Sequence, residues 1–116
     1  MKKKKKIKEV DVDKVFSIWI RQRDGYCVYP GTHGGNLQNS HFYTRTARSV
    51  RWDEFNCDAL CGKHHQFLEG RKNGEYYEFK LKQLGTARFK ALRRRYTTLK
   101  QWKQLELMSL IEKYKI

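Results

Sequence analysis

The sequence predicts a single mixed α+β domain, with a helix near the N-terminus, a short β-type region and a helical C-terminal half. Apolar residues recur every three or four positions over residues 12–20 and again beyond residue 63, which indicates helices. Between these stretches, residues 26–60 hold turn-forming Pro-Gly and Gly-Gly pairs beside short β-type runs. The chain has 116 residues, which suits one domain, and we expect it to occupy residues 11–116.

The N-terminal segment combines a cationic run with an amphipathic helix. Residues 2–6 are all lysines, and like charges this dense predict a flexible basic arm over residues 1–10. A helix is expected from Asp11, where Asp11 or Asp13 can cap it, to Gly25, which can end it. Its apolar stripe consists of Val12, Val15, Phe16, Trp19 and Ile20.

The remaining elements follow from turn residues and apolar spacing. Residues 26–29 and 37–44 are expected to pair as a hairpin with a long loop, and residues 44–51 form a basic loop. Helices are expected over residues 64–70 and 76–84. Two more should cover residues 87–96, capped by Thr86, and residues 99–114, capped by Thr98.

The charge of the chain points to a polyanionic partner. Lys and Arg number 26 against 12 acidic residues, which gives a net charge of +14 and a pI near 9.9. An excess of this size favours nucleic acid as the partner. No stretch approaches the roughly 20 apolar residues of a membrane span, and no apolar run with a cleavage site follows the lysines. We therefore expect a cytoplasmic protein without a membrane partner.

Three cysteines, an odd count, favour a metal site over a disulfide framework. Cys61 and His64 stand three residues apart, a spacing at which both side chains can bind one tetrahedral zinc ion. Cys27, which follows the first helix, is the natural third ligand. The alternative is that Cys27 and Cys61 are simply buried thiols.

The fourth zinc ligand is less clear from the sequence. The position three residues after Cys27, where a second ligand of that pair would stand, is occupied by Pro30, which cannot bind a metal. His33 is our preferred fourth ligand, because the intervening loop can fold it back. Cys57 is the second choice, and a site without a fourth protein ligand is the third.

His41, Asn56 and His65 form a second group that is suited to phosphodiester hydrolysis. A histidine with a pKa near ~6.5 can take a proton from water at neutral pH, which suits His41 to general-base catalysis. Asn56 can hydrogen-bond to the backbone and hold the loop that carries His41. His65 opens the helix beside the Cys61–His64 pair, where a divalent cation on the scissile phosphate could be held.

Several segments resemble the phage NinG/Rap recombination endonucleases, which are His-Asn-His (HNH) nucleases of the ββα-metal superfamily. Ser40-His41-Phe42 is similar to the Gly-His-Tyr motif of that family, and an Asn followed by Leu-Cys-x-x-His-His is similar to the end of many HNH nucleases. Residues 16–27 and 51–56 also match in order. The resemblance implies a ββα-metal unit at about residues 26–70, with a zinc knuckle, flanked by the N-terminal helix and the C-terminal helices.

The resemblance also implies an activity. It is the Mg²⁺- or Mn²⁺-dependent hydrolysis of branched DNA, such as Holliday junctions, during phage recombination, and a homodimer is possible. By position, His41 would be the general base, Asn56 the loop-orienting residue and His65 a ligand of the catalytic cation. The chain departs from the family where Pro30 replaces a cysteine. Ser40 also replaces the Asp or His that relatives of the wider fold carry before the base.

DNA contacts are expected to extend beyond the hydrolytic site. Arginine is suited to bidentate phosphate contacts, although the helical cluster could equally be an exposed charged face. The main rival function is a non-catalytic, zinc-stabilised DNA-binding protein, and a ribonuclease or toxin on the same fold is a third. The expected DNA-binding residues are Arg45, Arg48, Arg51, Arg93, Arg94 and Arg95.

Overall fold

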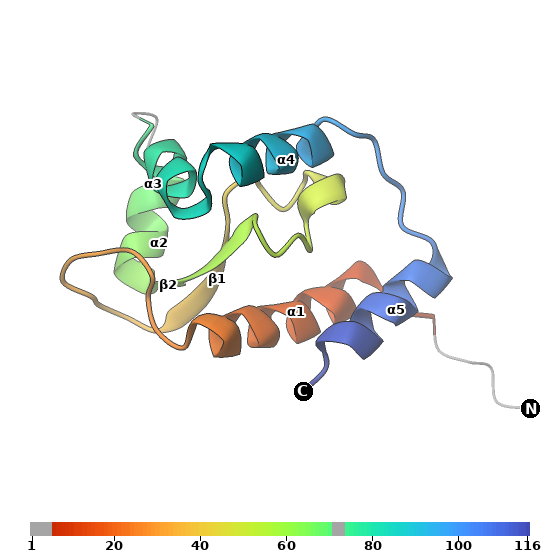
Figure 1. Cartoon of the computed structure of the whole chain (residues 1–116). Helices are drawn as coiled ribbons and strands as arrows, with labels where there is room; N and C mark the ends of the chain where they lie inside the picture. The colour runs from red at the N-terminus through yellow and green to blue at the C-terminus, as the bar shows by residue number, and fades with distance from the viewer. Residues whose placement is uncertain (1–5, 71–73) are drawn as a thin grey trace, which may run out of the picture.

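A computed structural model describes residues 6–70 and 74–116 of the chain (Figure 1). The N-terminal helix α1 leads to a two-stranded sheet, which is followed by four helices. A short 3₁₀ helix, Arg48–Val50, lies in the loop between the strands. The elements are α1 (Glu9–Asp24), β1 (Leu37–His41), β2 (Cys57–Cys61), α2 (Gly62–Glu69), α3 (Glu75–Leu84), α4 (Thr86–Tyr96) and α5 (Gln104–Tyr114).

The two strands pair antiparallel, with Leu37 opposite Cys61 and His41 opposite Cys57. The expected hairpin between residues 26–29 and 37–44 is therefore wrong. Residues 26–29 form no strand, and Val28 donates one backbone hydrogen bond to Ala59 at 3.0 Å. All five residues of β2 are buried, so the strand lacks the polar–apolar alternation by which a half-buried strand is recognised.

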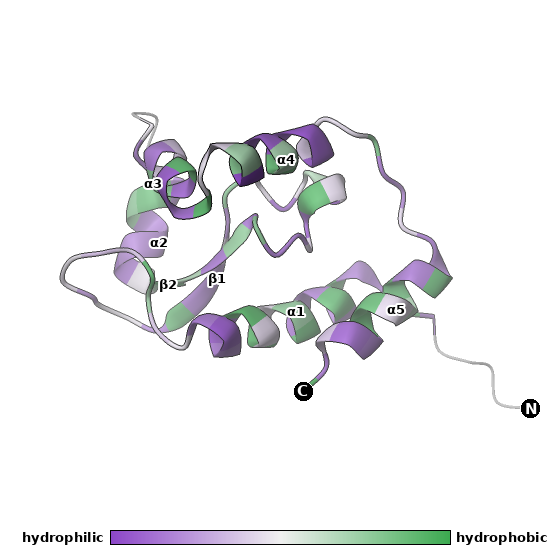
Figure 2. Ribbon diagram, in the orientation of Figure 1, coloured by the Kyte–Doolittle hydropathy of each residue, from purple (hydrophilic) through white to green (hydrophobic). Residues whose placement is uncertain are grey.

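Strand β2 separates two parts of the hydrophobic core. Cys57 and Ala59 lie in the part that α1 and α5 cover, where Phe16 of α1 is fully buried. Leu60 lies in the other part, with Leu68 of α2. Apolar residues of α1 and α5 meet where the two helices run side by side (Figure 2). The sheet thus lies between α1 on one face and the α2–α3 region on the other.

The helix ends differ from the expected ones where polar side chains provide a better cap. Helix α1 begins at Glu9, because the carboxylate of Asp11 accepts a hydrogen bond from the backbone N–H of Lys8 at 2.8 Å. The backbone N–H and C=O of Ile7 bond to the side chain of Gln104. Residues 7–10 of the expected arm therefore belong to the folded domain, and residues 1–5 lie outside the described part.

The last two helices also begin at other residues than expected. Gly85, with a φ of 80°, precedes α4, so Thr86 is its first residue and not its cap. Helix α5 begins at Gln104 and not at Leu99, whose side chain is fully exposed, and Thr98 donates its hydroxyl to the carbonyl of Arg94. None of the helices in the described ranges is both long and apolar enough to cross a membrane.

Candidate metal centre and adjoining cavity

Four side chains from three segments converge beside the start of α2. The ligand atoms of Cys27, His33, Cys61 and His64 all lie within 4.8 Å of one another. Nδ1 of His64 lies 3.3 Å from Nδ1 of His33, 3.3 Å from Sγ of Cys27 and 3.5 Å from Sγ of Cys61. Sγ of Cys61 lies 3.8 Å from Nδ1 of His33.

These separations fit a tetrahedral metal ion. With Zn–N bonds of about 2.0–2.1 Å and Zn–S bonds of about 2.3 Å, two nitrogens of a tetrahedron lie about 3.3–3.4 Å apart, and a nitrogen and a sulfur about 3.5–3.6 Å apart. The three separations that involve Nδ1 of His64 lie within about 0.3 Å of these values, and the other atoms of the group lie no more than 4.8 Å apart. The four residues can bind a metal ion such as zinc.

His33, which the sequence analysis preferred as the fourth ligand, belongs to the cluster, whereas Cys57, the second choice, does not. His33 is among the four converging residues, because the loop of residues 30–35 folds back over α2 and is fixed there by a hydrogen bond from the N–H of Lys63 to the carbonyl of Gly34. Cys57 lies elsewhere, fully buried in the core beneath α1, with its Sγ 3.8 Å from the carbonyl oxygen of Arg51.

The local backbone prepares Cys61 to act as a thiolate ligand. Cys61 is the N-cap of α2, and its Sγ accepts the backbone N–H of His64. Burial raises the pKa of Cys61, but hydrogen bonds from the backbone at Gly34 and His64 and from the His33 ring outweigh burial and lower this pKa to about 6. The thiolate, which is the form that binds metal, is therefore accessible at neutral pH.

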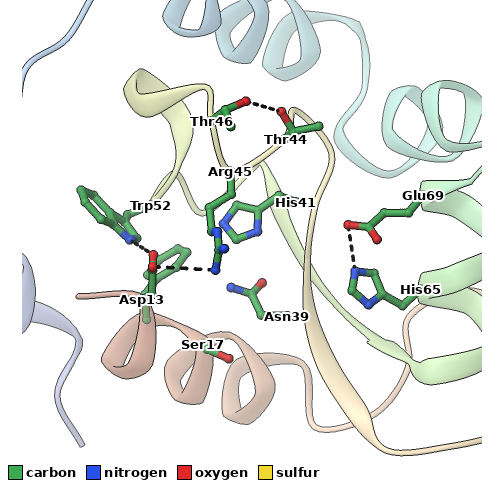
Figure 3. A pocket seen from close by; sticks show the side chains of 11 residues that line it. Asp13, Ser17, Asn39, His41, Thr44, Arg45, Thr46, Trp52, His65 and Glu69 are labelled. Carbon is green, nitrogen blue, oxygen red and sulfur yellow. Dashed lines mark hydrogen bonds and ion pairs between the residues drawn. The ribbon is translucent and has the colours of Figure 1, made fainter. Parts of the chain in front are cut away.

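A cavity of about 440 Å³ lies on the α1 side of β1 and reaches α2 (Figure 3). It brings His41, at the end of β1, and His65, in the first turn of α2, to one space. Arg45, from the loop that follows β1, enters the same space. The cavity is lined by Asp13, Phe16, Ser17, Asn39, His41, Thr44, Arg45, Thr46, Trp52, His65 and Glu69.

One hydrogen bond fixes the ring of His41. Nε2 of His41 lies 2.8 Å from the backbone carbonyl oxygen of Arg51, which can only accept, so Nε2 carries the proton. In the neutral ring, Nδ1 is then free to accept a proton. Burial lowers the pKa of His41, partly offset by the Arg51 carbonyl and the negative charge of Asp13, so the ring stays neutral at physiological pH.

Asn56 ties together the loop that joins the strands. Its side chain is fully buried, and Oδ1 accepts the backbone N–H of Tyr43 at 2.8 Å. Nδ2 donates to the carbonyl oxygens of Tyr43 and Val50, each at 3.0 Å. These three bonds clamp the segment after His41 to the segment that carries Arg51, so Asn56 holds both sides of the His41 hydrogen bond in place.

His65 lies between two acceptors at the edge of β1. Its Nδ1 bonds to Oε1 of Gln38, and its Nε2 lies 3.2 Å from a carboxylate oxygen of Glu69. Ser40, the residue before His41, does not reach the cavity. It is fully buried on the other face of β1, where its hydroxyl bonds to the hydroxyl of Tyr76 at 2.9 Å.

Among the lining residues that were not predicted as site residues, Asn39 and Glu69 have the side chains best suited to bind a cation. Their positions carried a signal, although a weak one. Asn39 precedes His41 by two residues, which places both on one face of a strand. Glu69 follows His65 by four residues, which places both on one face of a helix.

Four of the expected DNA-binding arginines make ion pairs: Arg51 and Arg95 through short contacts, and Arg45 and Arg48 through longer contacts of 4.0 Å to Asp13 and 3.8 Å to Glu9. Arg51 donates to Asp13 and Glu9, and its side chain is 12% exposed. Arg95 donates to both carboxylate oxygens of Asp53. Arg51 and Arg95 therefore do not form the free basic surface that the sequence predicted, because acidic residues of α1 and of the loop after Trp52 pair with them. The side chains of Arg45 and Arg48 are 65% and 60% exposed, and Arg93 and Arg94 are also exposed.

Comparison with known proteins shows the family of the chain. No curated protein and no solved structure matches it significantly. One family model, described as bacteriophage lambda NinG protein, matches residues 1–116, the whole chain. Because this match extends over the whole chain, the chain belongs to the phage lambda NinG family.

Proposed function

We propose that this protein is a metal-dependent endonuclease of the HNH (ββα-metal) type that hydrolyses phosphodiester bonds of DNA. The order β1, β2, α2 supports the proposal, because it places His41 at the end of the first strand, Asn56 before the second and His65 on the helix. Family membership supports a role in phage recombination, in the cytoplasm of the host cell.

The observation that carries the proposal is the fixed tautomer of His41 at the wall of the cavity. Nδ1 of His41 accepts a proton from a water molecule, whose oxygen attacks the phosphorus atom. The bond between phosphorus and the 3′ oxygen then breaks, which leaves a 5′-phosphate and, after protonation, a 3′-hydroxyl. A divalent cation such as Mg²⁺ or Mn²⁺, bound at His65, would stabilise the negative charge on the leaving oxygen.

The other groups position the reacting ones. Asn56 keeps the Arg51 carbonyl against Nε2 of His41 and is a positioning residue. Arg45, exposed at the mouth of the cavity, can contact the phosphate beside the cut. Zinc held by Cys27, His33, Cys61 and His64 would have a structural role, since these residues join the loop before β1 to the first turn of α2, which carries His65.

The DNA surface proposed here extends from Arg45 and Arg48 to the exposed Arg93 and Arg94 of α4. It omits Arg51 and Arg95, whose guanidinium groups make ion pairs of 2.5 Å with Asp13 and Asp53, and keeps Arg45 and Arg48, whose ion pairs are longer and whose side chains are mostly exposed. Branched DNA, such as a Holliday junction, is the proposed substrate. Two symmetric cuts on a junction require two sites, and the exposed apolar side chains of α5 leave a face for a second copy of the chain.

A cleavage assay tests this function. Labelled four-way junction, duplex DNA and RNA are incubated side by side with zinc-loaded protein in Mg²⁺, Mn²⁺ or EDTA. We expect cation-dependent cleavage of the junction, reduced roughly 10²–10⁴-fold in His41→Ala with junction binding and melting temperature retained. The control is Thr46→Ala, an exposed position in the wall of the same cavity.

Other outcomes would replace the proposal by one of its rivals. Junction binding without cleavage in either cation would identify a non-catalytic, zinc-stabilised DNA-binding protein. Cleavage of RNA alone would identify a ribonuclease. A folded His41→Ala variant with the activity of the parent would refute the role of His41.

A further inference from the structure

One buried polar atom in the cavity lacks the partner that its chemistry requires. Oδ1 of Asn39 is buried and accepts no hydrogen bond. Every other buried side-chain oxygen or nitrogen of the described residues has a hydrogen-bond partner. Leaving such a group unsatisfied costs about 1–3 kcal/mol. A free acceptor inside a cavity calls for a partner that is either a hydrogen-bond donor or a cation.

The position of Asn39 places this oxygen in the proposed active site. Asn39 shares a face of β1 with His41 and lies close to it in the view of Figure 3, in the cavity that His65 also lines. A phosphate oxygen cannot satisfy it, because both atoms are acceptors. The remaining candidates are a hydrogen-bond donor and a metal ion.

The surroundings of His65 favour a metal ion. His65 presents one ring nitrogen to each of two oxygens: Nδ1 bonds to Oε1 of Gln38, and Nε2 lies 3.2 Å from a carboxylate oxygen of Glu69. With bonds of about 2.1 Å at right angles, as in an octahedral site, one divalent ion would hold two ligand atoms about 3.0 Å apart, close to this separation. Metal-binding histidines characteristically donate their other ring N–H to an oxygen acceptor, as His65 does to Gln38.

We propose that Asn39 Oδ1, His65 Nε2 and the Glu69 carboxylate together hold the divalent cation of the cavity. This inference rests on the proposed function in one respect: the cation held here would be the one that serves hydrolysis. Oxygen ligands with one imidazole suit Mg²⁺ or Mn²⁺, whose remaining positions water and phosphate oxygens can fill. Asn39 and Glu69 thus supply the cation ligands that relatives of the wider fold take from the residue before the base. In this chain that residue is Ser40, whose side chain is turned to the other face of β1.

The test measures Mn²⁺ binding directly, without DNA. Zinc-loaded protein is titrated with Mn²⁺, and the free ion is followed by electron paramagnetic resonance. We expect Asn39→Ala and Glu69→Gln to weaken Mn²⁺ binding by at least ~10-fold. Asn39→Asp should retain or tighten binding, because a carboxylate replaces an amide oxygen. Thr46→Ala, at the wall of the same cavity, is the control and should bind as the parent does.

Thermal melting without Mn²⁺ separates a ligand from a structural side chain. Because Oδ1 makes no hydrogen bond in the fold, Asn39→Ala should melt at the same temperature as the parent or higher. A clear fall in melting temperature would show that Asn39 is structural and would overturn the inference. Parent-like Mn²⁺ affinity in Asn39→Ala would overturn it too.

The failure of this inference and the failure of the proposed function give different results. If the protein cleaves junctions while Asn39→Ala binds Mn²⁺ normally, the cation site is wrong and the nuclease stands. If Mn²⁺ binding depends on Asn39 while no nucleic acid is cleaved, the site stands and the nuclease is wrong.

Discussion

Removal of one metal ligand should destabilise the protein far more than removal of an equally buried cysteine outside the cluster. Cys61 and Cys57 stand at the two ends of β2, and both are buried. Only Cys61 belongs to the group of four converging ligands. Cys61→Ala therefore tests the metal site, and Cys57→Ala provides a matched control within the same strand.

The expected difference follows from the role of the cluster in the fold. The cluster joins the loop of residues 27–33 to the start of α2, and binding of structural zinc contributes about 10–16 kcal/mol. This contribution is as large as the whole net stability of a domain, about 5–15 kcal/mol. Since about 4 °C of melting temperature corresponds to 1 kcal/mol at this size, we expect Cys61→Ala to melt at least ~15 °C below the parent or to lack a cooperative transition.

Elemental analysis and circular dichroism provide the assay. Chelator-washed parent and Cys57→Ala should each retain about one zinc per chain, whereas Cys61→Ala should retain none. Cys57→Ala loses only a small apolar group and should melt within a few degrees of the parent. If the parent contains no zinc and the two variants melt alike, the metal centre is wrong.

Three further predictions concern charge and protonation. Burial lowers the pKa of His41, and only the neutral ring accepts a proton. We therefore expect kcat/KM to fall with decreasing pH, with a midpoint below ~6.5. A midpoint clearly above this value would contradict the assignment of His41 as the general base. Arg45→Ala should reduce the slope of log affinity against log salt by about 0.9, as binding titrations across salt concentrations would show. Arg51→Ala should leave that slope unchanged and lower the melting temperature, because its ion pair with Asp13 is lost. Lys80→Met should destabilise the fold by about 3–5 kcal/mol in urea unfolding, because it removes the charged partner at 3.0 Å from the buried Asp58 carboxylate and leaves only the amide of Gln83 beside it. The double variant with Asp58→Asn should recover much of this loss.

The elements with a strong local signal could be predicted from the sequence. The stripe of Phe16 and Ile20 identified α1, and the spacing of Cys61 and His64 identified half of the metal cluster. His33 could be chosen as a candidate because few metal-binding side chains lie near Cys27. Each of these predictions depends on contacts between residues close in the chain or on chemistry that few residue types can perform.

The features that depend on tertiary contacts could not be predicted. Strand β2 is buried on both faces, so its sequence has no alternation, and its pairing with β1 depends on a long loop. The pairing of Arg51 with Asp13 and Glu9 joins residues about 40 positions apart. The orphan oxygen of Asn39 is visible only once the surroundings of every buried atom are known.

The two histidines of the cavity are positioned by different parts of the fold. His65 follows directly after His64 of the Cys/His cluster, so a metal ion held by the cluster would determine where the first turn of α2 presents it. His41 depends on the Arg51 carbonyl, which the buried Asn56 holds in place through its hydrogen bond to Val50. Loss of the metal should therefore displace the cation site before it disturbs His41. Loss of the Asn56 side chain should disturb His41 and leave zinc content unchanged, so the two defects can be distinguished by elemental analysis and Mn²⁺ binding.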